Sequence, residues 1–226
     1  EQRITSQGGL VDMRIRFDEQ LKQLNKEMIN MGTMIEKSIG DAVKALMKQD
    51  VELAQKVMAG DEEIDRTERK IEDLCLRLLL QQQPVARDLR NISAALKMVT
   101  DMERIGDHAT DISELAIVLS EKTYVKKLDH IEEMARETMV MLIQSLEAYV
   151  EKDLDKAQKV IAHDDVIDDL FEEVKQELIE LIRNHADEGE QAVDLLMVTK
   201  YFERIGDHAT NIAEWVIFSI TGQIAG

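Results

Sequence analysis

The sequence predicts an all-α protein built from two tandem three-helix bundles, with six long helices in total. Three observations predict this fold. Apolar residues recur at intervals of three and four along most of the chain, which is the period of an amphipathic helix. No segment shows the period of two that marks a half-buried strand. An eight-residue sequence occurs twice, which indicates a duplicated unit.

Composition and charge exclude several classes of protein. The 226 residues include 46 Asp and Glu against 28 Lys and Arg, so the formal net charge is −18. This balance argues against binding nucleic acid or docking on anionic lipid, because their phosphates must be met by clustered cations. The single cysteine, Cys75, excludes an intramolecular disulfide, and no apolar run approaches the ~20 residues that span a bilayer. We therefore expect a cytoplasmic protein that does not insert into the membrane.

The chain opens with a segment that we expect to lie outside the fold. Residues 1–12 are polar and aperiodic, and they contain Gly8 and Gly9. We interpret them as a leader or an added segment, with Met13 as the native start, because the helical pattern begins there. The first helix then extends for about eight turns along an apolar seam. The seam consists of Phe17, Leu21, Leu24, Met28, Met31, Ile35, Ile39, Ala42 and Leu46.

Five further helices follow, separated by short connections. Gln49 and Asp50 form the first break, and the second helix continues to about Gln82. Pro84 fits the first turn of the third helix, where its missing N–H costs nothing, and this helix continues to about Glu121. Connections this short favour antiparallel neighbours. After a connection at 123–127, the last three helices are expected near residues 128–150, 154–185 and 189–220.

An internal repeat divides the chain into two halves. The segment Glu103-Arg-Ile-Gly-Asp-His-Ala-Thr110 recurs letter for letter as residues 203–210. A second echo lies upstream, where Ala54-Gln-Lys-Val is matched by Ala157-Gln-Lys-Val at an offset of 103 residues. The simplest account is a duplicated three-helix unit, with one bundle over residues 13–122 and the other over residues 123–222.

Repeated pairs of carboxylates are the candidate functional residues. In each half, the second and third helices carry two acids four residues apart, a spacing that places both on one helix face with Cβ atoms roughly 5–6 Å apart. On the third helix these acids continue the line of the apolar stripe that begins at Leu89. The eight acids are Asp61, Asp65, Glu103, Asp107, Asp164, Asp168, Glu203 and Asp207.

Carboxylates that converge from two helices repel one another, and a multivalent cation would remove this cost. Ligands that are all oxygen suit hard ions such as Mg, Ca, Mn or iron, and they do not suit a structural zinc site. We therefore predict one carboxylate-bound metal site in each bundle, holding one ion or several that share bridging oxygens. Asp111, Glu114 and Glu214 lie on the same line and are further candidate ligands, although Asn211 replaces the second copy of Asp111.

Two other repeated features bear on the packing of the helices. Gly106 and Gly206 stand in the middle of predicted helices, where glycine usually signals a close approach of helices. A second apolar line, roughly opposite the acids, indicates that the third and sixth helices also contact a neighbouring bundle or subunit. This line consists of Ile105, Ala109, Ile112 and Ala116 and is repeated as Ile205, Ala209, Ile212 and Val216.

Two alternatives to a metal-binding regulator stay open. The first is a carboxylate-bridged iron-binding bundle with a storage or redox role, but that class requires Glu three residues before a ligand His, and no His in this sequence has it. The second is a purely structural helical scaffold with solvated acids. We see no other catalytic constellation and expect no enzymatic activity.

The duplicated Glu-Arg-Ile-Gly-Asp motif, the paired acids and the segment Gln83-Pro-Val-Ala-Arg-Asp-Leu-Arg90 closely resemble the PhoU family of phosphate-uptake regulators. The likeness extends from Met13 to Thr221. It implies two three-helix bundles that bind multinuclear metal clusters of ions such as Fe, Mn or Mg at the paired motifs.

The resemblance also implies a non-catalytic role in phosphate homeostasis. A member of this family represses the phosphate-starvation response and connects the ATPase of a phosphate ABC transporter with a sensor histidine kinase. It would be cytoplasmic, peripheral to the membrane through these partners, and a homodimer. Two departures make the halves unequal: Asn211 breaks the repeat, and the Gln-Pro segment has no counterpart near Ala186.

Overall fold

The computed structural model of the chain describes residues 2–81 and 84–224, and the side chains of residues 14–80 and 84–224. Its described residues form six α-helices, one 3₁₀ turn and no strand, which confirms the all-α prediction. The elements are α1 (Gln2–Lys48), α2 (Val51–Gln81), α3 (Ala86–Leu119), α4 (Asp129–Glu151), α5 (Leu154–Asn184), the 3₁₀ turn η1 (Ala186–Glu188) and α6 (Gly189–Thr221). None of these helices combines the length and the apolar character that crossing a membrane requires.

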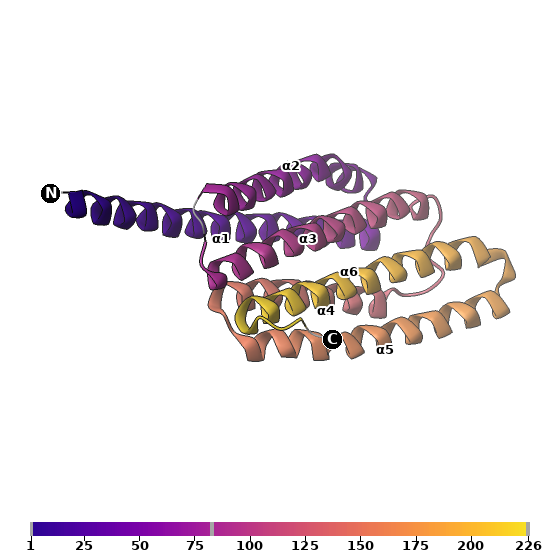
Figure 1. Cartoon of the computed structure of the whole chain (residues 1–226). Helices are drawn as coiled ribbons and strands as arrows, with labels where there is room; N and C mark the ends of the chain where they lie inside the picture. Colours follow the sequence, from indigo (N-terminus) through magenta and orange to yellow (C-terminus); the bar gives the residue numbers. More distant parts are fainter. Residues whose placement is uncertain (1, 82–83, 225–226) are drawn as a thin grey trace.

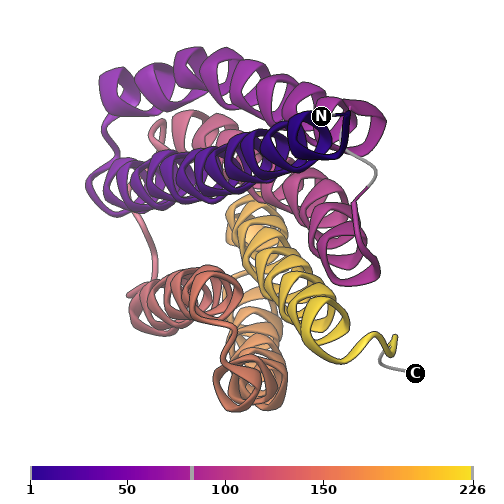
Figure 2. The same ribbon diagram turned by 60° about the vertical axis from the view of Figure 1, so that its left-hand side comes forward.

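The helices form two antiparallel three-helix bundles that lie side by side (Figures 1 and 2). Helices α1, α2 and α3 pack against one another in the first bundle, and α4, α5 and α6 do so in the second. The two bundles meet mainly where α3 packs on α6, and a smaller contact joins α1 to α4. The acidic helices α3 and α6 therefore lie at the centre of the molecule.

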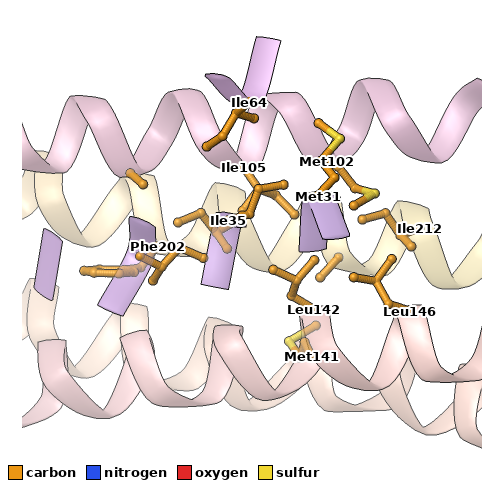
Figure 3. Close-up of a cluster of buried hydrophobic side chains, with 14 of the residues drawn as sticks. Met31, Ile35, Ile64, Met102, Ile105, Met141, Leu142, Leu146, Phe202 and Ile212 are labelled. Carbon is orange, nitrogen blue, oxygen red and sulfur yellow. The ribbon is translucent and has the colours of Figure 1, made fainter. Parts of the chain in front are cut away.

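One continuous hydrophobic core extends through both bundles. Its central part contains side chains from five helices (Figure 3). All eight residues of the second apolar line on α3 and α6 are buried, as expected for a face that contacts a neighbouring bundle. The labelled side chains in Figure 3 are Met31, Ile35, Ile64, Met102, Ile105, Met141, Leu142, Leu146, Phe202 and Ile212.

The break between α1 and α2 lies where the sequence predicts it and has a counterpart between α4 and α5. Gln49 adopts a left-handed conformation (φ 55°), and the Asp50 carboxylate accepts a hydrogen bond from the backbone N–H of Leu53 at 2.9 Å. At the equivalent place in the second half, Lys152 has φ 58°, and the Asp153 carboxylate caps α5. The duplication therefore extends to the turns.

Three local predictions differ from the structure. Helix α1 begins at Gln2, so residues 2–12 are helical, because extending an existing helix adds a hydrogen bond per residue and offsets the cost of two glycines. Pro84 lies two residues before α3 rather than in its first turn, and Gln82, the predicted end of α2, lies outside the described residues.

The third difference concerns the start of the apolar stripe on α3. Leu89 is 45% exposed, whereas its neighbour Asp88 is buried. The Asp88 carboxylate forms an ion pair with Arg14 of α1, at 2.8 Å between Oδ2 and Nη1. In the first turn of α3, the residue that faces α1 is therefore Asp88 and not Leu89. Its buried carboxylate is tolerated because the guanidinium of Arg14 pairs with it.

Candidate metal centres

A close approach of two helices positions the acids in each bundle. A Cβ atom built on Gly106 would lie 3.2 Å from Ile64 Cγ2 of α2, and the corresponding Cβ on Gly206 would lie 3.4 Å from Ile167 Cγ2 of α5. Asp61 and Asp164 lie next to these contacts, with Oδ1 at 3.9 and 3.5 Å from the built Cβ atoms. The expectation that both glycines permit close packing is confirmed, and this packing brings the acids of neighbouring helices together.

In the first bundle, three of the four predicted acids converge. Asp61, Asp65 and Asp107 each offer a carboxylate oxygen, and these three oxygens lie within 4.8 Å of one another. All three side chains are half-buried. Burial raises the pKa of Asp61, and the charges of Asp107 and Asp65 raise it further. Burial and mutual repulsion make the ionised form of these carboxylates unfavourable. A cation bound between them would offset this cost.

Glu103 lies beside this group but is not one of the three converging acids. Burial raises the pKa of Glu103, and the neighbouring charge of Asp107 adds to the increase. Arg104 lies at the outer edge of the cluster, with its guanidinium 3.1 Å from Asp107 Oδ2 and 3.6 Å from Glu103 Oε2. Because Arg104 is exposed, this pairing offsets little of the repulsion between the acids.

Glu68 is a further acid of the first cluster that the sequence reasoning missed. Burial and the charges of Glu103, Glu72 and Asp65 raise the pKa of Glu68 to about 7. Glu68 lies three residues after Asp65 and seven after Asp61, so all three share one face of α2. That spacing is visible in the sequence, but Glu68 has no acidic counterpart in the second half, so the internal repeat does not identify it.

The threonine of each repeated motif lies next to the first acid of its cluster. The hydroxyls of Thr110 and Thr210 are buried and have no hydrogen-bond partner of normal geometry among the residues that the structure describes. Each is close enough to lower the pKa of its neighbour, Asp61 or Asp164. An unpaired hydroxyl beside half-buried carboxylates supplies an additional oxygen, so the donors present in each bundle fit a hard cation.

The second cluster is more open and carries a cation of its own. Asp164 and Glu203 are half-buried, but Asp168 and Asp207 are exposed. Burial raises the pKa of Asp164, and Asp207 and Asp168 add to this effect. Among the described residues, no three acids of this bundle converge as Asp61, Asp65 and Asp107 do.

Lys200 forms an ion pair with Glu203 and lies 5.3 Å from the ring of Phe171. The corresponding positions of the first bundle hold Thr100 and Glu68. The first bundle therefore has Glu68 where the second has Phe171, and it has Thr100 where the second has Lys200. These two differences make the second cluster less negative.

The additional candidate acids lie apart from the converging group. The Asp111 carboxylate is 3.1 Å from His108 Nδ1 and contributes only the smallest effect on the pKa of Asp61. Glu114 is exposed and Glu214 is half-buried, and neither belongs to a convergent acidic group in the described part of the chain.

The histidines that follow the acids lie between the bundles. His208 Nδ1 is 2.8 Å from Asp101 Oδ1, and the Asn211 amide donates to the same oxygen at 3.1 Å. His108 stacks on Tyr201 with 5.4 Å between ring centroids. Burial lowers the pKa of His108. Both histidines therefore contact residues of the other bundle rather than the converging acids.

Comparison with known proteins places this architecture in a family. The model of the PhoU domain matches the chain twice, over residues 28–116 and 131–216. A Phosphate-specific transport system accessory protein PhoU homolog of Clostridium acetobutylicum is 40% identical over 92% of this chain and 95% of its own length. A homolog of the same name from Caulobacter vibrioides is 37% identical over 92% of this chain and 90% of its own length.

Two solved structures have the same fold. The crystal structure of PhoU from Pseudomonas aeruginosa superposes with a TM-score of 0.88 at 33% identity, covering 92% of this chain and all of the other. The phosphate transport system regulatory protein PhoU from Streptococcus pneumoniae gives a TM-score of 0.87 at 26% identity, covering 93% and 99% of the two chains. Two tandem matches to the domain, together with relatives that align over almost their full length, establish that the chain belongs to the PhoU family.

Proposed function

We propose that this protein is an accessory regulator of a phosphate-specific transport system and that its acidic clusters bind hard metal ions. The names of its relatives support the transport role. The convergence of Asp61, Asp65 and Asp107 is the observation that carries the metal-binding role, because three half-buried carboxylates repel one another unless a cation lies between them. Mn, Fe and Mg are the ions that such oxygen donors favour.

The protein acts through contacts rather than through chemistry of its own. In this proposal it connects the ATPase of the phosphate ABC transporter with a sensor histidine kinase, and it represses the response to phosphate starvation. The net charge of −18 supports association with basic protein surfaces. The protein is cytoplasmic, reaches the membrane through its partners and forms a homodimer.

The metal ion stabilises the bundle and makes the arrangement of α2 against α3 depend on metal occupancy. Asp61 and Asp65 of α2 and Asp107 of α3 would hold the ion in the first bundle, with Glu103 and Glu68 at its edges. In the second bundle, Asp164, Asp168, Glu203 and Asp207 would hold an ion more weakly, because Lys200 already pairs with Glu203.

Removal of two first-bundle acids tests the assignment. We expect Glu103→Ala with Asp107→Ala to abolish Mn²⁺ binding in the first bundle, measured by calorimetric titration of chelator-treated protein, while circular dichroism shows unchanged helicity. The matched control is Glu203→Ala with Asp207→Ala, which removes the equivalent acids of the second bundle and leaves the first-bundle binding intact. Unchanged Mn²⁺ stoichiometry and affinity in the first double variant would contradict the metal assignment.

Co-purification tests the regulatory role separately. Membranes from cells grown in high and low phosphate are incubated with the tagged protein, and the captured proteins are identified by mass spectrometry. We expect the transporter ATPase and a sensor kinase to be captured. Capture of neither protein would refute the adaptor role without affecting the metal assignment.

A further inference from the structure

Three basic side chains gather at the end of the molecule opposite the α5–α6 turn. Arg87 and Arg90 lie in the first two turns of α3, and Lys152 lies in the turn between α4 and α5. The start of α3, the α4–α5 turn and the end of α6 are at the same end of the two bundles (Figure 1). We call Arg87, Arg90 and Lys152 the basic cluster.

Contacts fix the positions of two of these side chains. Lys152 Nζ donates a hydrogen bond to Asn91 Oδ1 at 3.2 Å and lies 4.2 Å from the centroid of the Tyr149 ring. The side chain of Arg90 lies beside Gly222, the residue that ends α6, where a Cβ atom would come within 3.3 Å of Arg90 Cδ. Gly222 has φ 77°, so glycine both allows this turn and leaves room for the guanidinium.

Within the described residues, none of the three members of the basic cluster forms an ion pair, although exposed cations elsewhere, such as Arg66 and Lys175, do. Arg90 Nε is buried and has no hydrogen-bond partner. Burial, together with the charge of Arg87, lowers the pKa of Lys152 to about 8. Three cations on adjoining turns without a carboxylate partner give this end of the molecule a local positive potential, in contrast to the net charge of −18.

Three carboxylates close in sequence to the basic cluster are already engaged. Asp88 pairs with Arg14, Glu151 pairs with Lys156, and Asp153 caps α5. These acids are therefore held by other partners. The positive charge of the basic cluster stays available to a ligand from outside the chain.

We propose that Arg87, Arg90 and Lys152 form a binding site for an oxyanion of the phosphate type. Two guanidinium groups and one ammonium group supply the charge-assisted hydrogen bonds that a tetrahedral oxyanion accepts. The N-terminus of α3 has no side-chain cap at Val85, so its free N–H groups add positive potential at the same place. The site is independent of the acidic clusters.

Titration of the full chain with inorganic phosphate, in the presence of a chelator that keeps the acidic clusters metal-free, tests this site. We expect one phosphate per chain, and at least a tenfold loss of affinity in the double variant Arg87→Gln/Lys152→Gln. Arg87 is exposed and Lys152 is half-buried, so we expect the double variant to keep its helices. The control is Arg66→Gln/Lys175→Gln, which removes two exposed cations elsewhere and is expected to bind like the unmodified chain.

A second arm identifies the source of the oxyanion. Vesicles of phosphatidylcholine with and without phosphatidic acid present the same phosphate chemistry as a lipid headgroup, next to the exposed Val85 and Leu89. Binding to phosphatidic acid vesicles that is lost in the basic-cluster variant and kept in the control supports the site with a headgroup as its ligand. The site is overturned if neither phosphate nor these vesicles bind, or if the control loses as much affinity as the basic-cluster variant.

Discussion

At the scale of single residues, charge differences at equivalent positions distinguish the two acidic clusters. Glu68 is replaced by Phe171, Thr100 by Lys200, and Glu72, whose charge acts on Glu68, by Lys175. The first two changes remove a negative charge and add a positive one near Glu203. A symmetric backbone therefore holds two sites of different charge, which is expected to give them different affinities for a cation.

Lys200 should weaken metal binding in the second bundle. We expect Lys200→Thr, which restores the residue of the first bundle, to raise the affinity of the second cluster for Mn²⁺ about tenfold, because a positive charge next to Glu203 competes with the ion. Titration in the Glu103→Ala/Asp107→Ala background measures the second cluster alone. Arg183→Thr removes an exposed cation near the end of α5 as a control, and an equal gain in both variants would mean that only net charge matters.

Glu68 should make the stability of the metal-free protein depend on pH. The pKa of Glu68 in the folded chain, about 7, lies above the value of 4.5 that describes the unfolded chain, so the folded state binds the proton more tightly. The free energy of unfolding contributed by this group is fully present below pH 4.5 and is lost as the pH rises through about 7.

Thermal denaturation with a chelator tests this pH dependence. We expect Glu68→Gln to raise Tm by about 1–2 °C at pH 8 and to reduce the fall in Tm between pH 5 and pH 8. Glu180→Gln, an exposed change on α5, serves as the control. An unchanged pH dependence in Glu68→Gln would contradict the role of Glu68 in the cluster.

At the scale of helices, the two motif glycines set how closely neighbouring helices pack. A Cβ on Gly206 would meet only ordinary contacts of 3.4–3.5 Å, whereas a Cβ on Gly106 would lie 3.2 and 3.3 Å from two carbons of the buried Ile64. We expect Gly206→Ala to stabilise the protein by up to about 1 kcal/mol, because alanine favours helix. We expect no such gain in Gly106→Ala, because α2 must shift.

Chemical denaturation of the two alanine variants measures this difference. Each glycine serves as the control for the other, since both stand at the same place in the repeated motif. Equal stabilisation of the two variants would show that the packing of α2 on α3 is no tighter than that of α5 on α6.

The helices themselves were largely predictable from the sequence, because a 3.6-residue apolar period directly reflects which face is buried. Their ends were less predictable. Gln49 and Lys152 lie at equivalent places, and both breaks are predicted, but neither residue is a glycine, so the sequence gives no sign of their left-handed conformation. The exposure of Leu89 is not predictable from local sequence, because the buried carboxylate of Asp88 is satisfied by Arg14, a residue 74 positions away.

At the scale of the whole molecule, the packing of α3 on α6 joins both bundles through one core. The candidate site was partly predictable because the two bundles are copies of one repeated unit. The repeat identified the eight acids, but it could not identify Glu68 or Lys200, which differ between the halves. It also gave no indication that Asp168 and Asp207 are exposed, because exposure depends on how α5 meets α6.

Because the core is continuous, an ion bound in the first bundle should stabilise the whole chain. A ligand that binds only the folded state at 100 times its Kd contributes about 2.7 kcal/mol, and a protein of this size gains about 2–4 °C in Tm per kcal/mol. The most direct test is therefore the thermal unfolding of chelator-treated protein with increasing Mn²⁺. We predict a saturable rise in Tm of about 5–10 °C, absent in Glu103→Ala/Asp107→Ala. A Tm that stays constant up to millimolar Mn²⁺ would contradict the account.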